Sequence, residues 1–296
     1  MTRKSKRAGM KRVDIVYRCA EDASKAHERP HSAGEALRRL NQGSLTFASL
    51  FDGSASPDRD VRYEIHVDPR DFGLLDSADG SLRQVPFAAV LGCSDARVPV
   101  ELIFSEGPND LFVVRVAGNT LGDDVLGSLK FAVERLRASL NLIVVLGHSG
   151  CGAVTAAVDV FLDPAGYFSL ASRHSVRMLV DRLQVVVHAA ALRIDSECGA
   201  DIRRHPKYRN LLIETSVVTN TALAAHTLRQ EMMLTDAANV RAAYGVYLLS
   251  DRTVWAPRAG SDEVFGLAAP PDDPQGFVDF GKAVLRSKRM TDLLSA

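Results

Sequence analysis

Unbalanced charge, long apolar runs and abundant cysteine are all missing from this 296-residue chain. Lysine plus arginine and aspartate plus glutamate number 36 each, so global charge points neither to nucleic acid nor to an acidic membrane surface. No apolar run approaches the ~20 residues that span a bilayer. A content of 46% hydrophobic and 24% charged residues excludes disordered and fibrous proteins. We therefore expect a globular protein with no nucleic acid and no membrane as partner.

Only four cysteines occur, which is too few for a disulfide framework in a chain of this length. Cys19 and Cys198 stand in unremarkable surroundings, and we expect free thiols there. Cys93 and Cys151 each come shortly after an apolar run. In a reducing compartment, such cysteines more often bind metal or act in catalysis. The cysteine usage therefore predicts a cytoplasmic protein in which Cys93 and Cys151 are functional.

The N-terminal third of the chain is the least regular part. The first twelve residues include six basic and no acidic ones, and no apolar signal-peptide segment follows. We expect residues 1–32 to form a basic, irregular segment. The pattern from Ser32 predicts an amphipathic helix that ends at Gly43. Residues 51–82 are rich in Asp, Gly and Ser, and we expect them to be mainly connection.

The middle of the chain contains short apolar runs of the kind found in strands buried on both faces. These runs are residues 84–92, 110–118 and 141–147. A later run over 242–250 predicts one more strand. Helices are predicted over 120–140, where Thr120 and Asp123 have capping-box-like spacing, from about Gly152, over about 207–230, and over 277–294 after a linker.

Strands that alternate with helices predict an α/β fold with a central, mostly parallel sheet flanked by helices. Ligands in such sheets bind beyond the carboxyl ends of the strands. Cys93 follows the first predicted strand, and His148 and Cys151 follow the third. Because neighbouring strands lie ~4.8 Å apart, the three side chains can converge on one point.

Two cysteines and one histidine are ligands that zinc prefers, and three protein ligands leave the fourth tetrahedral position open, as in catalytic sites. The alternative is that all three are ordinary buried residues. Asp95 and Arg97 follow Cys93 in the segment CSDAR. Asp95 could be a fourth metal ligand, it could be held by Arg97 as a proton acceptor, or the two could form an ordinary surface ion pair.

The segments CSDARVP and GHSGCGAV resemble the two signature motifs of the β-carbonic anhydrases. DLFVVRVAGN and GSLKFAVERL between them are similar to the same family in order and spacing, as are GEALRRLNQGSLTFA upstream and AAYGVYLLSDRTV downstream. The resemblance covers roughly residues 33–255 and implies a catalytic domain there. Residues 1–32 would precede it as an N-terminal segment and residues 256–296 would follow as a linker and helical extension.

The resemblance also implies roles for single residues. Cys93, His148 and Cys151 match the family's zinc ligands, one Zn²⁺ per chain, and Asp95 with Arg97 matches its Asp–Arg dyad. The substrate pocket is implied to include Gln84, Phe112, Phe131 and the backbone N–H of Gly152. The implied reaction is reversible hydration of carbon dioxide to bicarbonate and a proton by zinc-bound hydroxide.

Family members are built from dimers whose pockets both subunits line, so the resemblance implies a homodimer or a dimer of dimers. A branch that is closed by the aspartate has an upstream tryptophan, whereas Trp255 is the only tryptophan here. We therefore expect the open, plant-like site.

Other functions of the same residues stay open. Carbonyl sulfide or carbon disulfide hydrolysis on the same zinc is one alternative, and a non-catalytic zinc-binding scaffold is another. A redox pair of Cys93 and Cys151 is a poor alternative because the chain has no CxxC.

Overall fold

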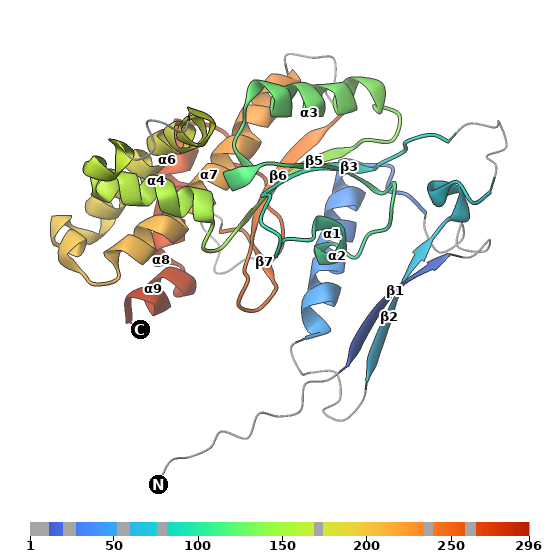
Figure 1. Cartoon of the computed structure of the whole chain (residues 1–296), viewed down its shortest axis with the longest axis horizontal. Coiled ribbons are helices and arrows are strands. Elements are labelled where there is room, and N and C mark those ends of the chain that lie inside the picture. Colours follow the sequence, from blue (N-terminus) through green and yellow to red (C-terminus); the bar gives the residue numbers. More distant parts are fainter. Residues whose placement is uncertain are drawn as a thin grey trace, which may run out of the picture.

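The computed structural model describes residues 12–19, 28–51, 60–75, 82–168, 174–233, 239–257 and 265–295. The basic start of the chain lies outside these ranges except for Arg12. The described elements form a five-stranded sheet with helices on both faces and a separate two-stranded ribbon (Figure 1). Among the described helices, none has the length and apolarity needed to cross a membrane.

The five-stranded sheet has the order β4-β3-β5-β6-β7. Its first four strands run parallel, and β7 pairs antiparallel with β6. The strands are β3 (Ala88–Gly92), β4 (Leu111–Arg115), β5 (Leu142–His148), β6 (Arg241–Tyr247) and β7 (Val254–Trp255). The four strands predicted from apolar runs are therefore confirmed, and so is the mostly parallel α/β sheet.

Both faces of the sheet are covered, which explains why its strands are apolar at successive positions. In β3, Ala89 and Leu91 pack with the helices of one face, while Ala88 and Val90 pack with those of the other. The helices on the first face are α3 (Asp123–Arg135), α4 (Gly152–Leu162), α6 (His174–Cys198), α7 (Tyr208–Met233) and α8 (Pro274–Arg286). The second face carries α1 (Ala33–Ser49) and α2 (Val100–Ile103).

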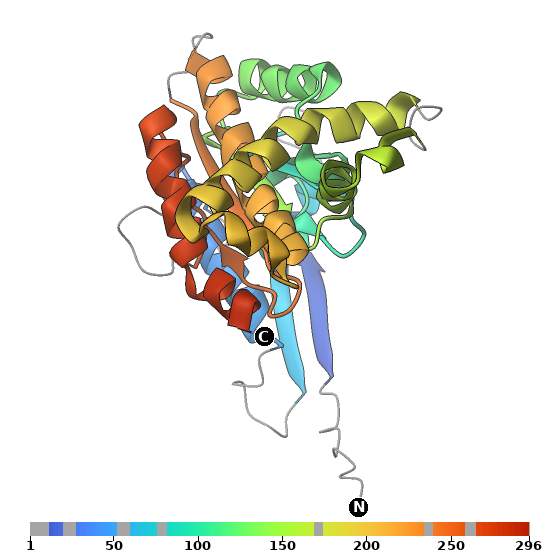
Figure 2. The same ribbon diagram turned by 90° about the vertical axis from the view of Figure 1, so that its left-hand side faces the viewer.

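The chain ends in α9 (Lys288–Ser295), and Figure 2 shows α8 and α9 in red beside α7 in orange. Short 3-10 helices occur at Pro69–Phe72, Ala117–Asn119, Pro164–Gly166 and Ala200–Arg204. The helices predicted from Gly152 and over 207–230 are confirmed as α4 and α7. The single terminal helix predicted over 277–294 is instead two helices, because Ser287 has extended backbone angles between α8 and α9.

The prediction that Gly43 ends the first helix is wrong. Helix α1 continues through Gly43 to Ser49. A Cβ atom at residue 43 would lie 1.8 Å from the carbonyl oxygen of Phe104. Glycine is needed there for close contact between α1 and the backbone after α2, rather than as a helix terminator.

The segment predicted to be mainly connection also contains structure. Strand β2 (Val61–Val67) pairs in parallel with β1 (Val13–Cys19), and this ribbon projects from the molecule in both views (Figures 1 and 2).

The prediction of a capping box at Thr120 and Asp123 is wrong as well. Helix α3 begins at Asp123 with Gly122 as its N-cap residue, and no side chain caps it. Helix α6, which has 25 residues, was not predicted.

Candidate metal centre

Three donor side chains meet at the carboxyl ends of β3 and β5. Gly92, the last residue of β3, pairs with Leu146 in β5, so the two strands end side by side. Cys93 follows β3 directly, His148 is the last residue of β5, and Cys151 is the N-cap residue of α4. All three side chains are buried. The parallel register, rather than proximity in sequence, brings Cys93 to the other two.

The ligand atoms of Cys93, His148 and Cys151 lie within 4.8 Å of one another. The two sulfur atoms are 3.9 Å apart. This distance is close to the separation of about 3.8 Å between two sulfurs bonded to one tetrahedral zinc. The buried Nε2 of His148 has no hydrogen-bond partner among the described residues. Its Nδ1 lies 3.1 Å from the carbonyl oxygen of Ser149, which favours the tautomer with a free lone pair on Nε2. The donor set therefore fits zinc.

The environment of Cys93 stabilises a thiolate. Hydrogen bonds from the Cys151 thiol and from the backbone amides of Asp95 and Gly118 lower the pKa of Cys93, although burial opposes the shift. The hydrogen bond with the Cys93 sulfur and burial raise the pKa of Cys151. A divalent cation that binds both sulfurs would take the place of the proton they share.

The CSDAR segment forms a tight turn beside these donors. The Arg97 guanidinium donates to both carboxylate oxygens of Asp95, at 2.9 and 2.7 Å, and its backbone amide donates to Asp95 Oδ1. These bonds hold the pKa of Asp95 well below its usual range, against the effect of burial. Oδ2 of Asp95 lies 3.8 Å from Nε2 of His148. A carboxylate is therefore held beside the donor cluster, oriented by a bidentate arginine.

Arg115, at the end of β4, fastens this turn from the neighbouring strand. Its Nε donates to the carbonyl oxygen of Cys93 at 3.0 Å, and its Nη2 donates to that of Asp95 at 2.6 Å. Arg115 was not identified from the sequence. It could have been identified from its position at the carboxyl end of a predicted strand, because ligands bind beyond these strand ends.

Gly118 is a second residue of the site that was not identified from the sequence. Its amide donates to the Cys93 sulfur at 3.3 Å, and its φ of +67° lies in the left-handed region. Asn220 of α7 donates to the Gly118 carbonyl oxygen at 2.9 Å and so fixes the peptide. A Cβ at residue 118 would lie 3.1 Å from that of Ala153. Here the conformation and the available space both favour glycine.

Gln84 and Phe112 lie away from the three metal-ligand candidates in the structure. They line a cavity of about 500 Å³ at the amino ends of β3 and β4, and none of the three metal-ligand candidates borders it. The five residues of β3 alone put roughly 13 Å between its two ends. Within one chain, the structure therefore does not bring Gln84 and Phe112 to the donor cluster.

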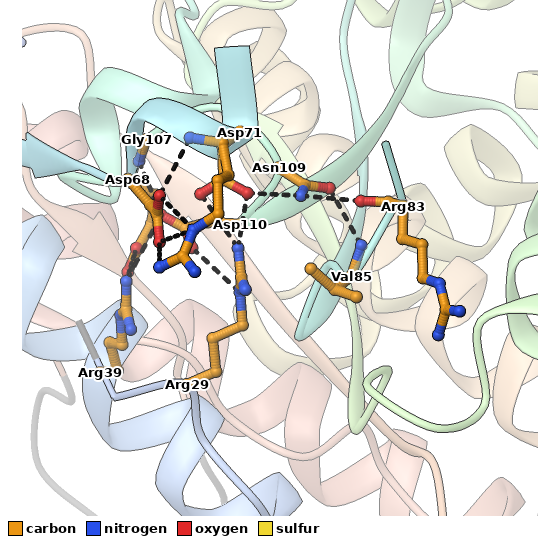
Figure 3. Close-up of polar contacts among 11 residues, drawn as sticks. Arg29, Arg39, Asp68, Asp71, Arg83, Val85, Gly107, Asn109 and Asp110 are labelled. Atoms are coloured by element: carbon orange, nitrogen blue, oxygen red, sulfur yellow. Dashed lines mark hydrogen bonds and ion pairs between the residues drawn. The ribbon is translucent and has the colours of Figure 1, made fainter. Parts of the chain in front are cut away.

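The backbone on both sides of Gln84 is held by Asn109 (Figure 3). The Asn109 Oδ1 accepts from the amide of Val85 at 3.0 Å, and its Nδ2 donates to the carbonyl oxygen of Arg83 at 3.1 Å. The same Nδ2 donates to Asp71 at 2.6 Å. Asn109 has a φ of +66°, which asparagine tolerates better than most residues. Neither Asn109 nor Asp71 was identified from the sequence.

Asp71 is part of a larger polar network (Figure 3). Arg29 donates to both carboxylate oxygens of Asp71, at 3.0 and 3.1 Å, and lies 3.8 Å from Asp110. Arg39 of α1 pairs with the buried Glu106 at 2.5 Å and lies 3.5 Å from Asp110. The network therefore connects the segment before α1, α1 itself and the loop before β4.

The two remaining predicted site residues lie on helices. Gly152 is the first residue of α4, directly after Cys151, and it is exposed. Phe131 lies on α3, and 54% of its surface is exposed. No contact in the described chain brings Phe131 to the donor cluster.

Comparisons with known proteins agree with this arrangement. The model of the carbonic anhydrase family matches residues 88–247, which include all three metal-ligand candidates. Carbonic anhydrase 2 of Mycobacterium tuberculosis is 49% identical over 87 residues, which are 28% of this chain and 41% of that protein. A carbonic anhydrase of Mycolicibacterium smegmatis is 45% identical over 114 residues, or 38% of this chain and 50% of that protein. The chain thus spans half or less of the length of these curated relatives.

Among solved structures, the β-carbonic anhydrase CcaA is similar at 24% identity, over 64% of this chain and 84% of that one, with a TM-score of 0.46. The family model spans more than half of this chain and contains both the CSDAR turn and the turn from His148 to Cys151. The chain therefore belongs to the β-class carbonic anhydrase family.

Proposed function

We propose that the protein is a zinc-dependent carbonic anhydrase that reversibly hydrates carbon dioxide to bicarbonate and a proton. The observation that carries the proposal is the buried group of two sulfurs and one imidazole beside a carboxylate that is fully engaged by an arginine. Family membership supports the same reaction class. The described residues offer three donors for the metal at this point.

Cys93, His148 and Cys151 would hold one Zn²⁺ per chain. Zinc supplies Lewis acidity that lowers the pKa of a coordinated water to near 7, which makes hydroxide chemistry possible at neutral pH. Two observations support this assignment. Nε2 of His148 has no hydrogen-bond partner among the described residues, and the pKa of Cys93 is lowered, so the His148 nitrogen and the Cys93 sulfur can both donate to a cation. Cys151 would lose its proton when the metal binds.

Asp95 and Arg97 are the proposed catalytic residues. Asp95 would accept the proton of the attacking water and release it toward solvent, while Arg97 holds the carboxylate in place. Both bonds to Arg97 keep the carboxylate turned toward the guanidinium, which supports the open, plant-like branch of the family. In this proposal Asp95 is not a metal ligand.

The remaining pocket residues are proposed to bind substrate. Gln84 would hydrogen-bond carbon dioxide or bicarbonate, Phe112 and Phe131 would form apolar walls, and the Gly152 amide would donate to the substrate. Because Gln84 and Phe112 lie at the opposite end of β3, they would serve the zinc of a second copy. The proposal therefore includes a homodimer or a dimer of dimers.

We also propose residues 33–255 as the catalytic unit, with residues 1–32 and 256–296 as its N-terminal and C-terminal extensions. All four cysteines are free of disulfides. Free thiols fit a reducing environment, so the proposed location is the cytoplasm.

A stopped-flow hydration assay with metal analysis tests the function. We expect one zinc per chain and rapid hydration by the wild type. Asp95→Asn keeps the size of the side chain but removes the proton acceptor, so kcat should fall by about 100-fold or more while zinc content stays the same. Asp195→Asn is the matched control, since Asp195 forms the same bidentate pair with Arg203 on the surface.

The control variant should hydrate carbon dioxide at the wild-type rate. Zinc-loaded wild type that turns over carbonyl sulfide or carbon disulfide but not carbon dioxide would replace the proposed substrate. Zinc binding without turnover of any of the three gases would instead favour the non-catalytic scaffold.

A further inference from the structure

The turn between His148 and Cys151 is held by a residue outside the five-stranded sheet. The Gly150 amide at the centre of this turn donates to Oε1 of Glu214 at 2.8 Å. Glu214 lies on α7, and only 13% of its side chain is exposed. A carboxylate on a neighbouring helix thus fixes the backbone that joins two of the three proposed zinc ligands.

Glu214 is in turn held by the C-terminal helix. Nη2 of Arg289, on α9, donates to Oε2 of Glu214 at 2.6 Å. One carboxylate oxygen of Glu214 therefore accepts a hydrogen bond from the turn between His148 and Cys151, and the other accepts one from Arg289. Helix α9 (Lys288–Ser295) lies beyond residues 88–247, the range that matches the family model. The contact comes from a part of the chain that the family pattern does not cover.

We infer that Arg289 is a positioning residue for the metal-binding turn and that it acts through Glu214 to retain zinc. The inference rests on the proposed function, because it takes Cys151 and His148 as zinc ligands. Groups that orient the residues around a metal commonly contribute about 10- to 100-fold to its affinity. In this chain the C-terminal extension supplies that group.

Charge explains why Glu214 needs Arg289. Glu214 is mostly buried, and an unpaired carboxylate in such a place costs free energy that rotation toward solvent would relieve. Rotation would break the bond to the Gly150 amide. Arg289 neutralises the carboxylate and orients it, so that the second oxygen stays on the turn.

The surroundings make the contact testable by substitution. Gly150, Glu214 and Arg289 all border a cavity of about 560 Å³ between α7 and α9. Truncation of Arg289 therefore enlarges an existing space that water can fill, rather than opening a void in a packed core. The alternative role is purely structural, in which the ion pair only docks α9 on α7.

Zinc release from the full-length, zinc-loaded protein to a colorimetric chelator distinguishes the two roles. We expect Arg289→Ala to release zinc about 10-fold faster than the wild type. Arg286→Ala is the matched control, because Arg286 belongs to the same extension and lies 3.8 Å from Glu197, away from the metal turn. Its release rate should equal that of the wild type. Arg289→Lys should restore part of the retention.

A double-mutant comparison adds a readout that a docking role would not move. In a Glu214→Gln background, Arg289→Ala should cause little further acceleration, because the two act as one unit. Glu214→Gln also serves as the test variant where Arg289→Ala does not fold, and it should itself accelerate release.

Four outcomes would overturn the inference. Equal release rates for Arg289→Ala and the wild type, or equal acceleration by Arg289→Ala and Arg286→Ala, would leave α9 with a structural role only. Additive effects of Arg289→Ala and Glu214→Gln would show that Arg289 does not act through Glu214. A wild-type chain that retains no zinc would overturn the proposed function, and this inference with it.

Discussion

Single backbone amides do much of the positioning around the donor cluster. The Gly118 amide reaches the Cys93 sulfur, and Asn220 holds the Gly118 peptide in turn. Two residues with positive φ, Gly118 and Asn109, therefore lie at points where the backbone conformation serves a contact. Each of them leads to a prediction about a single substitution.

Gly118→Ala should destabilise the fold. A left-handed φ costs a residue other than glycine about 1–3 kcal/mol, and the new methyl group would lie 3.1 Å from Ala153 and 3.3 Å from Leu183. Urea unfolding measures the loss. Gly127→Ala on α3 is the control, because its Cβ would meet nothing within 4 Å and alanine stabilises a helix by up to about 1 kcal/mol. Unchanged stability of Gly118→Ala would contradict the strain argument.

Asn109→Gly tests the clamp on the backbone beside Gln84. Glycine keeps the positive φ but removes the bonds to Arg83, Val85 and Asp71. We expect kcat/KM for carbon dioxide to fall roughly 5-fold, equivalent to about 1 kcal/mol, the net worth of one hydrogen bond. The fall should vanish in a Gln84→Ala background. Equal falls in both backgrounds would mean that Asn109 does not act through Gln84.

The sequence predicted the three residues that meet in the donor cluster but not the residues that hold them. Cys93, His148 and Cys151 could be found because each stands at or shortly after the end of an apolar strand, and strand ends converge in a parallel sheet. Asn109 contacts residues up to 38 positions away. Such partners depend on how loops meet after folding, and no local pattern records them.

Among the secondary-structure elements, α1 shows how a local signal can mislead. A glycine after a helical pattern usually marks the helix end. In α1 the glycine instead permits close packing on the Phe104 backbone. Strands of the main sheet were predictable because they are buried on both faces, whereas β2 belongs to the projecting ribbon and alternates only partly between exposed and buried residues.

Gly43→Ala should disturb the packing of α1 on the sheet. The added methyl group would overlap the Phe104 carbonyl, so α1 must move, and overpacking of this kind costs about 3 kcal/mol. Thermal or urea unfolding measures the change. Gly34→Ala is the matched control in the same helix, since its nearest heavy atom would be Arg38 Nη1 at 3.7 Å. A Gly43→Ala protein as stable as Gly34→Ala would show that the contact tolerates a side chain.

At the scale of the whole molecule, the proposed site is divided between two ends of one sheet. The proposed metal donors lie at the carboxyl ends of β3 and β5, and the cavity with Gln84 and Phe112 lies at the amino ends of β3 and β4. A single chain holds both halves but does not join them. The proposed function therefore depends on how copies of the chain associate.

Mixed oligomers test this division. Cys93→Ser should abolish zinc binding, and Gln84→Ala should impair substrate binding, so each homo-oligomer should be weakly active. When the two chains are co-expressed, random pairing into dimers gives about one quarter intact sites, and activity should recover accordingly. The control is a mixture of the two proteins purified separately and kept from exchanging subunits. No recovery after co-expression would place Gln84 and the zinc of one site in the same chain.

The parallel pairing of β3 with β5 also sets the order of events during folding. Cys93 and Cys151 are 58 positions apart, and the register of the two strands alone brings their sulfurs together. The loop between them must close before the pair exists, and long-range closure of this kind is slow. A metal ion that binds both sulfurs would therefore bind a sheet whose register has already formed. Its binding energy would act mainly against unfolding.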